Sequence, residues 1–174
     1  MGQDKADVLI SGTTMLDRVA AAVRPVCHRL VLLGPDRLGW DSWADSVHAS
    51  GPLAGVATAL ARAVEPRVMV VAVDHAYVTT STLGRLADMV STHAVVPVDD
   101  EGVRQVTCAV YPTGIAAAAR EEATAGGSIQ TLLDRVSFRA VAPDEWRAWG
   151  EDGRSWFSVD SEDSLEEGRA RFGV

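Results

Sequence analysis

The sequence predicts an α/β protein, in which a mostly parallel central sheet carries helices on both faces to give three layers. Short aliphatic runs alternate with helical patterns of about ten residues, as expected when strands and helices alternate along a parallel sheet. The composition is that of a globular chain, with 47% hydrophobic and 23% charged residues. No internal repeat, linker or low-complexity tract divides the 174 residues, so we expect one domain, residues 1–174.

Helices are predicted where apolar residues recur every three to four positions, and hydroxyl-bearing residues suited to N-capping precede several of them. The capping candidates are Thr13 or Thr14, then Ser50, then one of Thr79, Thr80 and Ser81. Pro52 fits the first turn of the second helix, where a missing N–H does no harm. The predicted helices span residues 15–23, 52–64, 82–90, 113–123, 128–136, 143–149 and a last stretch from about 162.

Strands are predicted where β-branched and aliphatic residues form short runs between turn signals. The predicted strands span residues 28–34, 68–73, 94–98, 104–112, 138–141 and 155–159. The run from Val68 to Val73 is the most continuous, so we expect it to be a central strand, and Asp74 follows it directly. Ligands gather at the carboxyl ends of strands in such sheets, where a carboxylate is well placed to hold Mg²⁺. The position of Asp74 by itself is equally compatible with a residue that caps the next turn or helix.

The charge balance narrows the choice of partner. The formal net charge is −8, whereas a protein that binds nucleic acid normally carries a basic surface, so we expect no nucleic-acid partner. A phosphorylated small molecule remains compatible, because backbone amides, single lysines and a metal ion supply positive charge locally. No run approaches the roughly 20 apolar residues of a membrane span and the start is no signal peptide, so we expect a cytoplasmic protein without a membrane partner.

Three short motifs are the candidates for chemistry. "SGPLAG" places a glycine-proline turn, Gly51 and Pro52, at the start of a helix whose free amides suit a nucleotide. "VVAVD" supplies Asp74, and "GQDK" supplies Lys5 beside a glycine turn. The chain contains neither G-x-G-x-x-G nor G-x-x-x-x-G-K-[ST]. His75 is the one histidine next to a candidate ligand, and we expect it to lie in a solvated loop.

Together and in this order, the motifs resemble the molybdenum cofactor guanylyltransferases and their close nucleotidyltransferase relatives. The resemblance covers nearly the whole chain and is most specific in "GPLAG", in "VDHAYV" and in the closing "VDSEDSL". It implies a Rossmann-like nucleotidyltransferase fold and the transfer of GMP from GTP to the terminal phosphate of molybdopterin, with release of pyrophosphate. The substrates and partners would therefore be GTP and molybdopterin, and Mg²⁺ the metal.

The resemblance also implies roles for single residues. Asp74 matches the aspartate that binds Mg²⁺, and Lys5 would contact the nucleotide phosphates. Gly51, Pro52 and Leu53 would line the nucleotide site. Asp45, in the loop just before them, corresponds to an aspartate that contacts the base.

The sequence departs from the family pattern near its C-terminus. The guanylyltransferases usually have N-x-N there, and this chain has Ser158, Val159 and Asp160. Asp160 is either a second metal ligand, as in relatives with other base preferences, or the cap of the last helix. This departure leaves open a nucleotidyltransferase that uses CTP or a sugar phosphate.

A second departure lies at the start of the sequence. The family pattern opens with a strand and a glycine-rich loop, L-A-G-G-x-S-x-R, directly before M-G-x-D-K, and this sequence begins at Met1 and Gly2. We expect the natural start to lie upstream and the present chain to be inactive or severely impaired. The alternatives are a chain that fills the gap by rearrangement or with another subunit's strand, and a catalytically impaired relative that binds nucleotide. Whether the protein is a monomer or a homo-oligomer stays open.

Overall fold

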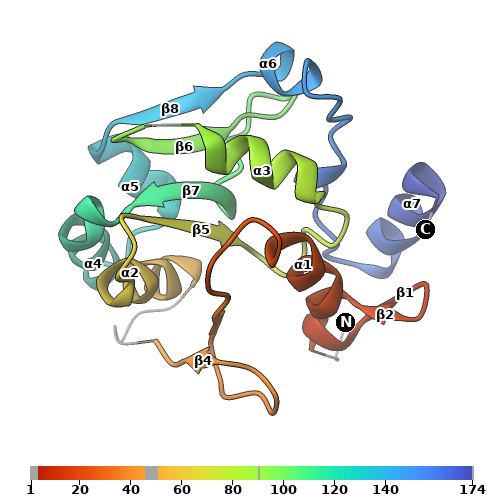
Figure 1. Ribbon diagram of the computed structural model, residues 1–174, viewed down its shortest axis with the longest axis horizontal. Helices are drawn as coiled ribbons and strands as arrows, with labels where there is room; N and C mark the ends of the chain where they lie inside the picture. The colour runs from red at the N-terminus through yellow and green to blue at the C-terminus, as the bar shows by residue number, and fades with distance from the viewer. Residues whose placement is uncertain (1–3, 46–50, 90, 174) are drawn as a thin grey trace.

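The computed structural model describes residues 4–45, 51–89 and 91–173. Its centre is a four-stranded sheet in the order β5-β7-β6-β8, with β5 (Arg67–Val71), β7 (Cys108–Pro112), β6 (Ala94–Pro97) and β8 (Phe138–Val141). Figure 1 shows these strands stacked from β8 at the top to β5 at the bottom. Two smaller pairings lie outside this sheet and join β1 (Leu9–Ile10) to β2 (Thr13–Thr14) and β3 (Leu32–Leu33) to β4 (Ser42–Trp43).

The helices lie on both faces of the sheet. The α-helices are α1 (Met15–Val23), α2 (Pro52–Arg62), α3 (Thr80–Asp88), α4 (Ala116–Thr124), α5 (Ile129–Arg135), α6 (Pro143–Arg147) and α7 (Glu162–Phe172). The 3-10 helices are η1 (Lys5–Asp7), η2 (Thr113–Ile115) and η3 (Arg154–Trp156). None of the helices in the described ranges is long and apolar enough to cross a membrane.

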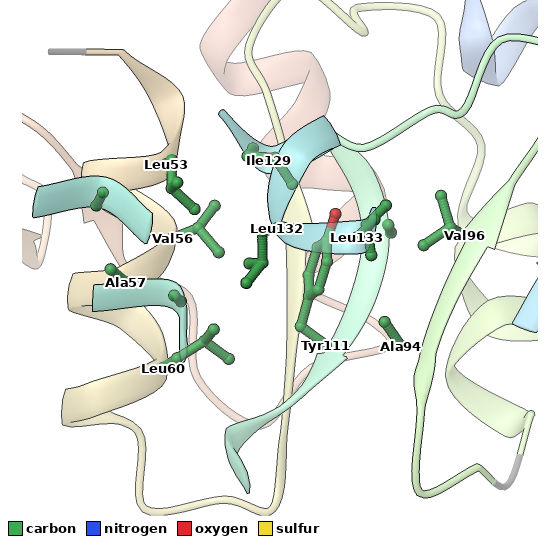
Figure 2. Close-up of a cluster of buried hydrophobic side chains, with 13 residues drawn as sticks. Leu53, Val56, Ala57, Leu60, Ala94, Val96, Tyr111, Ile129, Leu132 and Leu133 are labelled. Atoms are coloured by element: carbon green, nitrogen blue, oxygen red, sulfur yellow. The ribbon is translucent and has the colours of Figure 1, made fainter. Parts of the chain in front are cut away.

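Side chains alternate between the two faces of each strand and so divide the core. On one face, Ala109 and Tyr111 of β7 pack with apolar residues of α2, α4 and α5, as Figure 2 shows around Tyr111 and Leu132. On the other face, Cys108 and Val110 of β7 pack with α1, α3 and the tryptophan of α6. The predicted three-layer α/β arrangement is therefore confirmed.

The sheet is mixed, so the expectation of a mostly parallel sheet needs correction. β6 and β8 are parallel, but β7 runs antiparallel to both β5 and β6. The physical reason is the connection between β6 and β7. A turn at Asp99–Gly102, where Gly102 adopts a positive φ of 81°, reverses the chain without a helix. Parallel neighbours would need a helical crossover at this point.

The apolar run after Pro66 is an edge strand, although the sequence predicted a central one. β5 pairs only with β7 in the described sheet, and all five of its residues are half-buried. In contrast, all five residues of β7 are buried. An apolar composition thus indicates that a strand can be covered on both sides, but the order of the sheet decides whether it is.

Several element boundaries also differ from the predictions. The predicted strand 28–34 contracts to the two residues of β3, and the predicted strand 155–159 begins as η3 and continues without strand pairing. Thr14 and Thr79 are the N-caps of α1 and α3, and each accepts a hydrogen bond from a backbone N–H of the first turn. Gly51 occupies the N-cap position of α2, and Ser50 lies outside the described residues.

Candidate functional site

Asp74 lies in the turn directly after β5, at the carboxyl end of that strand. Its backbone carbonyl accepts a 2.9 Å hydrogen bond from Val159 N, which joins this turn to the segment before α7. Its side-chain Oδ1 is buried and has no hydrogen-bond partner among the described residues. A buried carboxylate oxygen without a donor is costly unless a cation or another donor faces it. The position therefore suits a bound cation, and α3 takes its cap from Thr79 instead.

The chain brings Lys5 and Asp160 together beside this turn. Lys5 Nζ, on η1, donates a 2.5 Å hydrogen bond to Asp160 Oδ1, and Ser158 Oγ donates to Asp160 Oδ2 at 2.9 Å. The Lys5 hydrogen bond, followed by that of Ser158, holds the pKa of Asp160 below its usual range despite an opposing contribution from burial. Asp160 is therefore an anionic group at this edge of the sheet.

The N-cap of α7 is Ser161, whose side chain accepts from Ser164 N, while Ser164 Oγ accepts from Ser161 N. This reciprocal pair is a capping box. Of the two roles that the sequence left open for Asp160, helix capping is consequently taken by its neighbour. The side chain of Asp160 does not cap the helix and instead accepts hydrogen bonds from Lys5 and Ser158.

His75 is buried, with 2% exposure, so the prediction of a solvated loop residue was wrong. Its Nε2 lies 3.0 Å from Thr107 Oγ1, and its Nδ1 is buried without a partner among the described residues. Burial lowers the pKa of His75, an effect that the charges of Asp74 and Asp160 oppose. The residue turns inward because the backbone at 72–78 forms two consecutive turns, closed by bonds from His75 N to Ala72 O and from Val78 N to His75 O.

The glycine-proline turn forms the N-terminus of α2, as predicted. Gly51 has a positive φ of 93°, a conformation that L side chains rarely adopt, and Pro52 is the first helical residue. Both residues line a large cavity. Leu53 does not face this cavity, because its side chain is 2% exposed and packs in the core beside α4 and α5, as Figure 2 shows. The structure therefore does not place Leu53 at the predicted nucleotide site.

Asp45 lies beside the same helix. Its Oδ1 would be 3.5 Å from a Cβ built on Gly55 of α2, and its side chain lines the same cavity as Gly51 and Pro52. Residues 46–50, between Asp45 and the helix, lie outside the described part of the chain. The structure thus brings together the three predicted nucleotide contacts Asp45, Gly51 and Pro52.

The predicted site residues therefore form two groups. Lys5, Asp74 and Asp160 meet at the carboxyl end of β5, and the second group lies at the start of α2. The cavity is lined by Asp45, Gly51 and Pro52 of the second group and by Asp4 and Val73, the sequence neighbours of Lys5 and Asp74.

Sequence reasoning missed Arg37, which lines this cavity and whose Nη2 donates a 2.5 Å hydrogen bond to Asp7 Oδ1 of η1. It also missed Thr107, the partner of His75. Arginine and threonine in loops carry no periodic signal, so nothing in the sequence pattern distinguished them.

The oxygen donors fit a hard cation such as Mg²⁺, which prefers carboxylates and completes its shell with water and substrate phosphates. Asp74 supplies the orphaned oxygen, and Asp160 supplies a second carboxylate nearby. Within the described ranges, no group of three or more His, Cys, Asp or Glu side chains has metal-binding geometry. A metal held here would thus depend on a phosphorylated ligand for part of its coordination.

Comparison with known proteins shows which family the chain resembles. The family model of the MobA-like NTP transferase domain matches residues 1–140. A molybdenum cofactor guanylyltransferase from Desulfosudis oleivorans is 25% identical over 177 residues, which covers 97% of this chain and 87% of the relative. A probable molybdenum cofactor guanylyltransferase from Deinococcus radiodurans is 37% identical over 82 residues. That match spans 45% of this chain and 42% of the relative, less than half of either.

Solved structures share the fold. Molybdopterin-guanine dinucleotide biosynthesis protein A from Archaeoglobus fulgidus superposes with a TM-score of 0.84 at 19% identity, over 99% of this chain and 92% of that one. The 2-C-methyl-D-erythritol 4-phosphate cytidylyltransferase from Thermus thermophilus gives 0.71 at 19% identity, over 99% and 95% of the two chains. These likenesses identify the Rossmann-like nucleotidyltransferase fold. Because the family model covers most of the chain, this protein belongs to the MobA-like NTP transferase family and is an enzyme of the nucleotidyltransferase type.

Proposed function

We propose that this protein transfers GMP from GTP to the terminal phosphate of molybdopterin, in a Mg²⁺-dependent reaction of molybdenum cofactor biosynthesis that releases pyrophosphate. The guanylyltransferases that it resembles over most of their length support the role in this pathway. We further propose that the whole chain acts as one domain in the cytoplasm. The observation that carries the proposal is Oδ1 of Asp74 at the carboxyl end of β5, which is buried and has no hydrogen-bond partner among the described residues.

In this proposal, each group of residues has a distinct task. Asp74, with Asp160 as the second carboxylate, would hold the metal, and bound Mg²⁺ would offset charge on the phosphate oxygens. Lys5 would leave Asp160 Oδ1 to contact the nucleotide phosphates, a shift that its half-exposed side chain permits. The amides at the start of α2 and the carboxylate of Asp45 would orient the nucleotide. The acceptor phosphate attacks directly, so no nucleophilic side chain is required.

The first test is the substitution Asp74→Ala, assayed by pyrophosphate release with GTP, Mg²⁺ and molybdopterin on the form isolated from its own cells. We expect turnover to fall about thousandfold or more, because removing a group that stabilises charge in the transition state typically has effects of that size. The thermal unfolding midpoint should stay within a few degrees, since Oδ1 makes no hydrogen bond to any residue that the structure describes. Glu166→Ala, at an exposed carboxylate of α7, is the control and should retain activity.

Wild-type rates in Asp74→Ala would refute the metal assignment. Parallel titrations with CTP and GTP would show which nucleotide base the protein prefers. The comparison is needed because Asp160, at the family's N-x-N position, leaves open an enzyme that uses CTP. Weak nucleotide binding that is insensitive to Mg²⁺, with no pyrophosphate from any substrate combination, would instead identify a catalytically impaired nucleotide-binding relative.

A further inference from the structure

A second buried carboxylate lies in the segment that leads to Asp160. Glu151, between α6 and η3, is 5% exposed. Its Oε1 accepts hydrogen bonds from the backbone N–H groups of residues 152, 153 and 155 at 3.1, 2.9 and 3.2 Å. Its Oε2 accepts from the hydroxyls of Ser155 and Thr82 at 2.6 and 2.5 Å. Both oxygens are thus occupied by donors of this chain, so Glu151 is not itself a ligand for a metal or a substrate.

These hydrogen bonds attach Glu151 to the N-terminal turn of α3. Thr82 is the third residue of α3, and Ser155 Oγ accepts a 3.3 Å hydrogen bond from the backbone N–H of Thr79, the N-cap. A carboxylate is stabilised at a helix N-terminus by the helix dipole. None of the ion pairs within the described ranges supplies Glu151 with a basic partner. Figure 1 shows the segment between α6 and α7 passing the N-terminal end of α3.

Both of the joined segments lead to the candidate metal ligands. Thr79 lies five residues after Asp74, and Ser155 lies five residues before Asp160. The segments are joined a second time where Val159 N donates to Asp74 O at 2.9 Å. Attachment at the first point restricts how the second segment rotates about the hydrogen bond at Val159. The contacts of Glu151 therefore act on the distance between the two carboxylates.

We propose that Glu151 is a positioning residue, which holds the segment carrying Asp160 in place beside Asp74 and so sets the spacing of the two carboxylates. The inference rests on the proposed function, because the spacing affects the reaction only if both carboxylates act on one metal. Residues that orient metal ligands without touching the metal typically change metal affinity or activity about tenfold to hundredfold. An effect of this size is expected for Glu151.

The test compares the wild type with Glu151→Gln, both produced in the cells from which the protein comes. Glutamine keeps the size of the side chain but places an NH₂ group against donors that need an acceptor. Without substrate, we expect amide hydrogen exchange at Val159 to become about tenfold faster or more. In the pyrophosphate assay, kcat should fall, and the Mg²⁺ concentration for half-maximal rate should rise, each about tenfold to hundredfold. KM for GTP should change little, since the predicted base contacts lie at the start of α2.

Glu122→Gln is the matched control for a purely structural effect. Glu122 is also buried, at 9% exposure, and its Oε2 accepts a 2.6 Å hydrogen bond from Arg135, between α4 and α5. This variant should lower the thermal unfolding midpoint and leave kcat, the Mg²⁺ requirement and exchange at Val159 unchanged. The amide of Val98, which donates to Val141 O, reports opening of the sheet and should keep its exchange rate in both variants.

A milder variant serves if Glu151→Gln does not fold. Ser155→Ala removes the hydroxyl between Glu151 and Thr79 but leaves the carboxylate its other donors. It should change exchange at Val159 and the Mg²⁺ requirement in the same direction, by a smaller factor.

The outcomes separate this inference from the proposed function. Unchanged exchange at Val159 overturns the positioning role, whatever the activity. Faster exchange with wild-type kcat and Mg²⁺ requirement overturns it too, as do equal kinetic losses in Glu151→Gln and Glu122→Gln. A wild type that transfers no GMP contradicts the proposed function, and faster exchange at Val159 in Glu151→Gln alone then still supports the role of Glu151 in holding the two segments together.

Discussion

β5 and β7 are paired along five residues each, yet they occupy different environments. All five residues of β7 are buried between neighbours on both sides and helices on both faces. β5 contains the longer apolar run, but it lies at the edge of the described sheet and is half-buried throughout. The difference shows that the burial of a strand depends on its place in the sheet. An apolar composition shows only that the strand can be covered on both faces.

The largest expected effect compares the two strands directly. Val110→Ala on β7 should lower the free energy of unfolding by about 2 kcal/mol, because it deletes two buried carbons and leaves a cavity. Val70→Ala on β5 should cost about 1 kcal/mol, since its side chain is already partly exposed. Chemical denaturation of both variants checks this. Equal losses would contradict the comparison and indicate that β5 is covered in solution.

An intermediate effect concerns a hydrogen bond from β7 to the segment that precedes it. Tyr111 is fully buried, and its Oη donates a 2.6 Å hydrogen bond to Val106 O. Tyr111→Phe should therefore cost about 1–2 kcal/mol, because the buried carbonyl loses its donor. Tyr77→Phe is the matched control, since the Tyr77 hydroxyl is buried without a partner among the described residues. We expect that control to be neutral or slightly stabilising, and similar losses in both would contradict the assignment.

The smallest expected effect lies at the carboxyl end of β5. The pKa of Asp160 is lowered in the folded state, so its charge adds stability above its ordinary pKa of 3.8. That stability is lost as the pH falls below 3.8 and through the folded value. The side chains of Lys5 and Asp160 are 37% and 62% exposed, so solvent screening limits the effect to about 0.5 kcal/mol or less.

Unfolding free energies of the wild type and Asp160→Asn between pH 3 and 7 check this prediction. The difference between the two proteins should shrink toward the acidic end of the range. Asp36→Asn is the control, because Asp36 is exposed and forms no ion pair in the described part of the chain. A difference that grows as the pH falls would show that Asp160 is not stabilised by Lys5.

The sequence anticipated much of the candidate site because its signals are local. Gly51 and Pro52 lie at the start of α2, and Asp74 follows a strand. Short-range sequence patterns predict both positions. The contact of Lys5 with Asp160 joins residues 155 positions apart, so no local pattern contains it. The same holds for the burial of His75, which depends on Thr107 and on the segment before α7.

The sequence by itself determined the class of the fold, most helices and the positions of the candidate ligands, because periodicity, capping and turn residues act over a few positions. Only the tertiary structure decided the mixed direction of the sheet, the edge position of β5 and the cavity beside it. Strand order results from which distant segments pack together, and the apolar pattern of β5 is compatible with either a central or an edge strand. The physical reason is that the side-chain pattern shows which faces of a strand are apolar, whereas the segments that pack beside the strand determine how much of that apolar surface is buried.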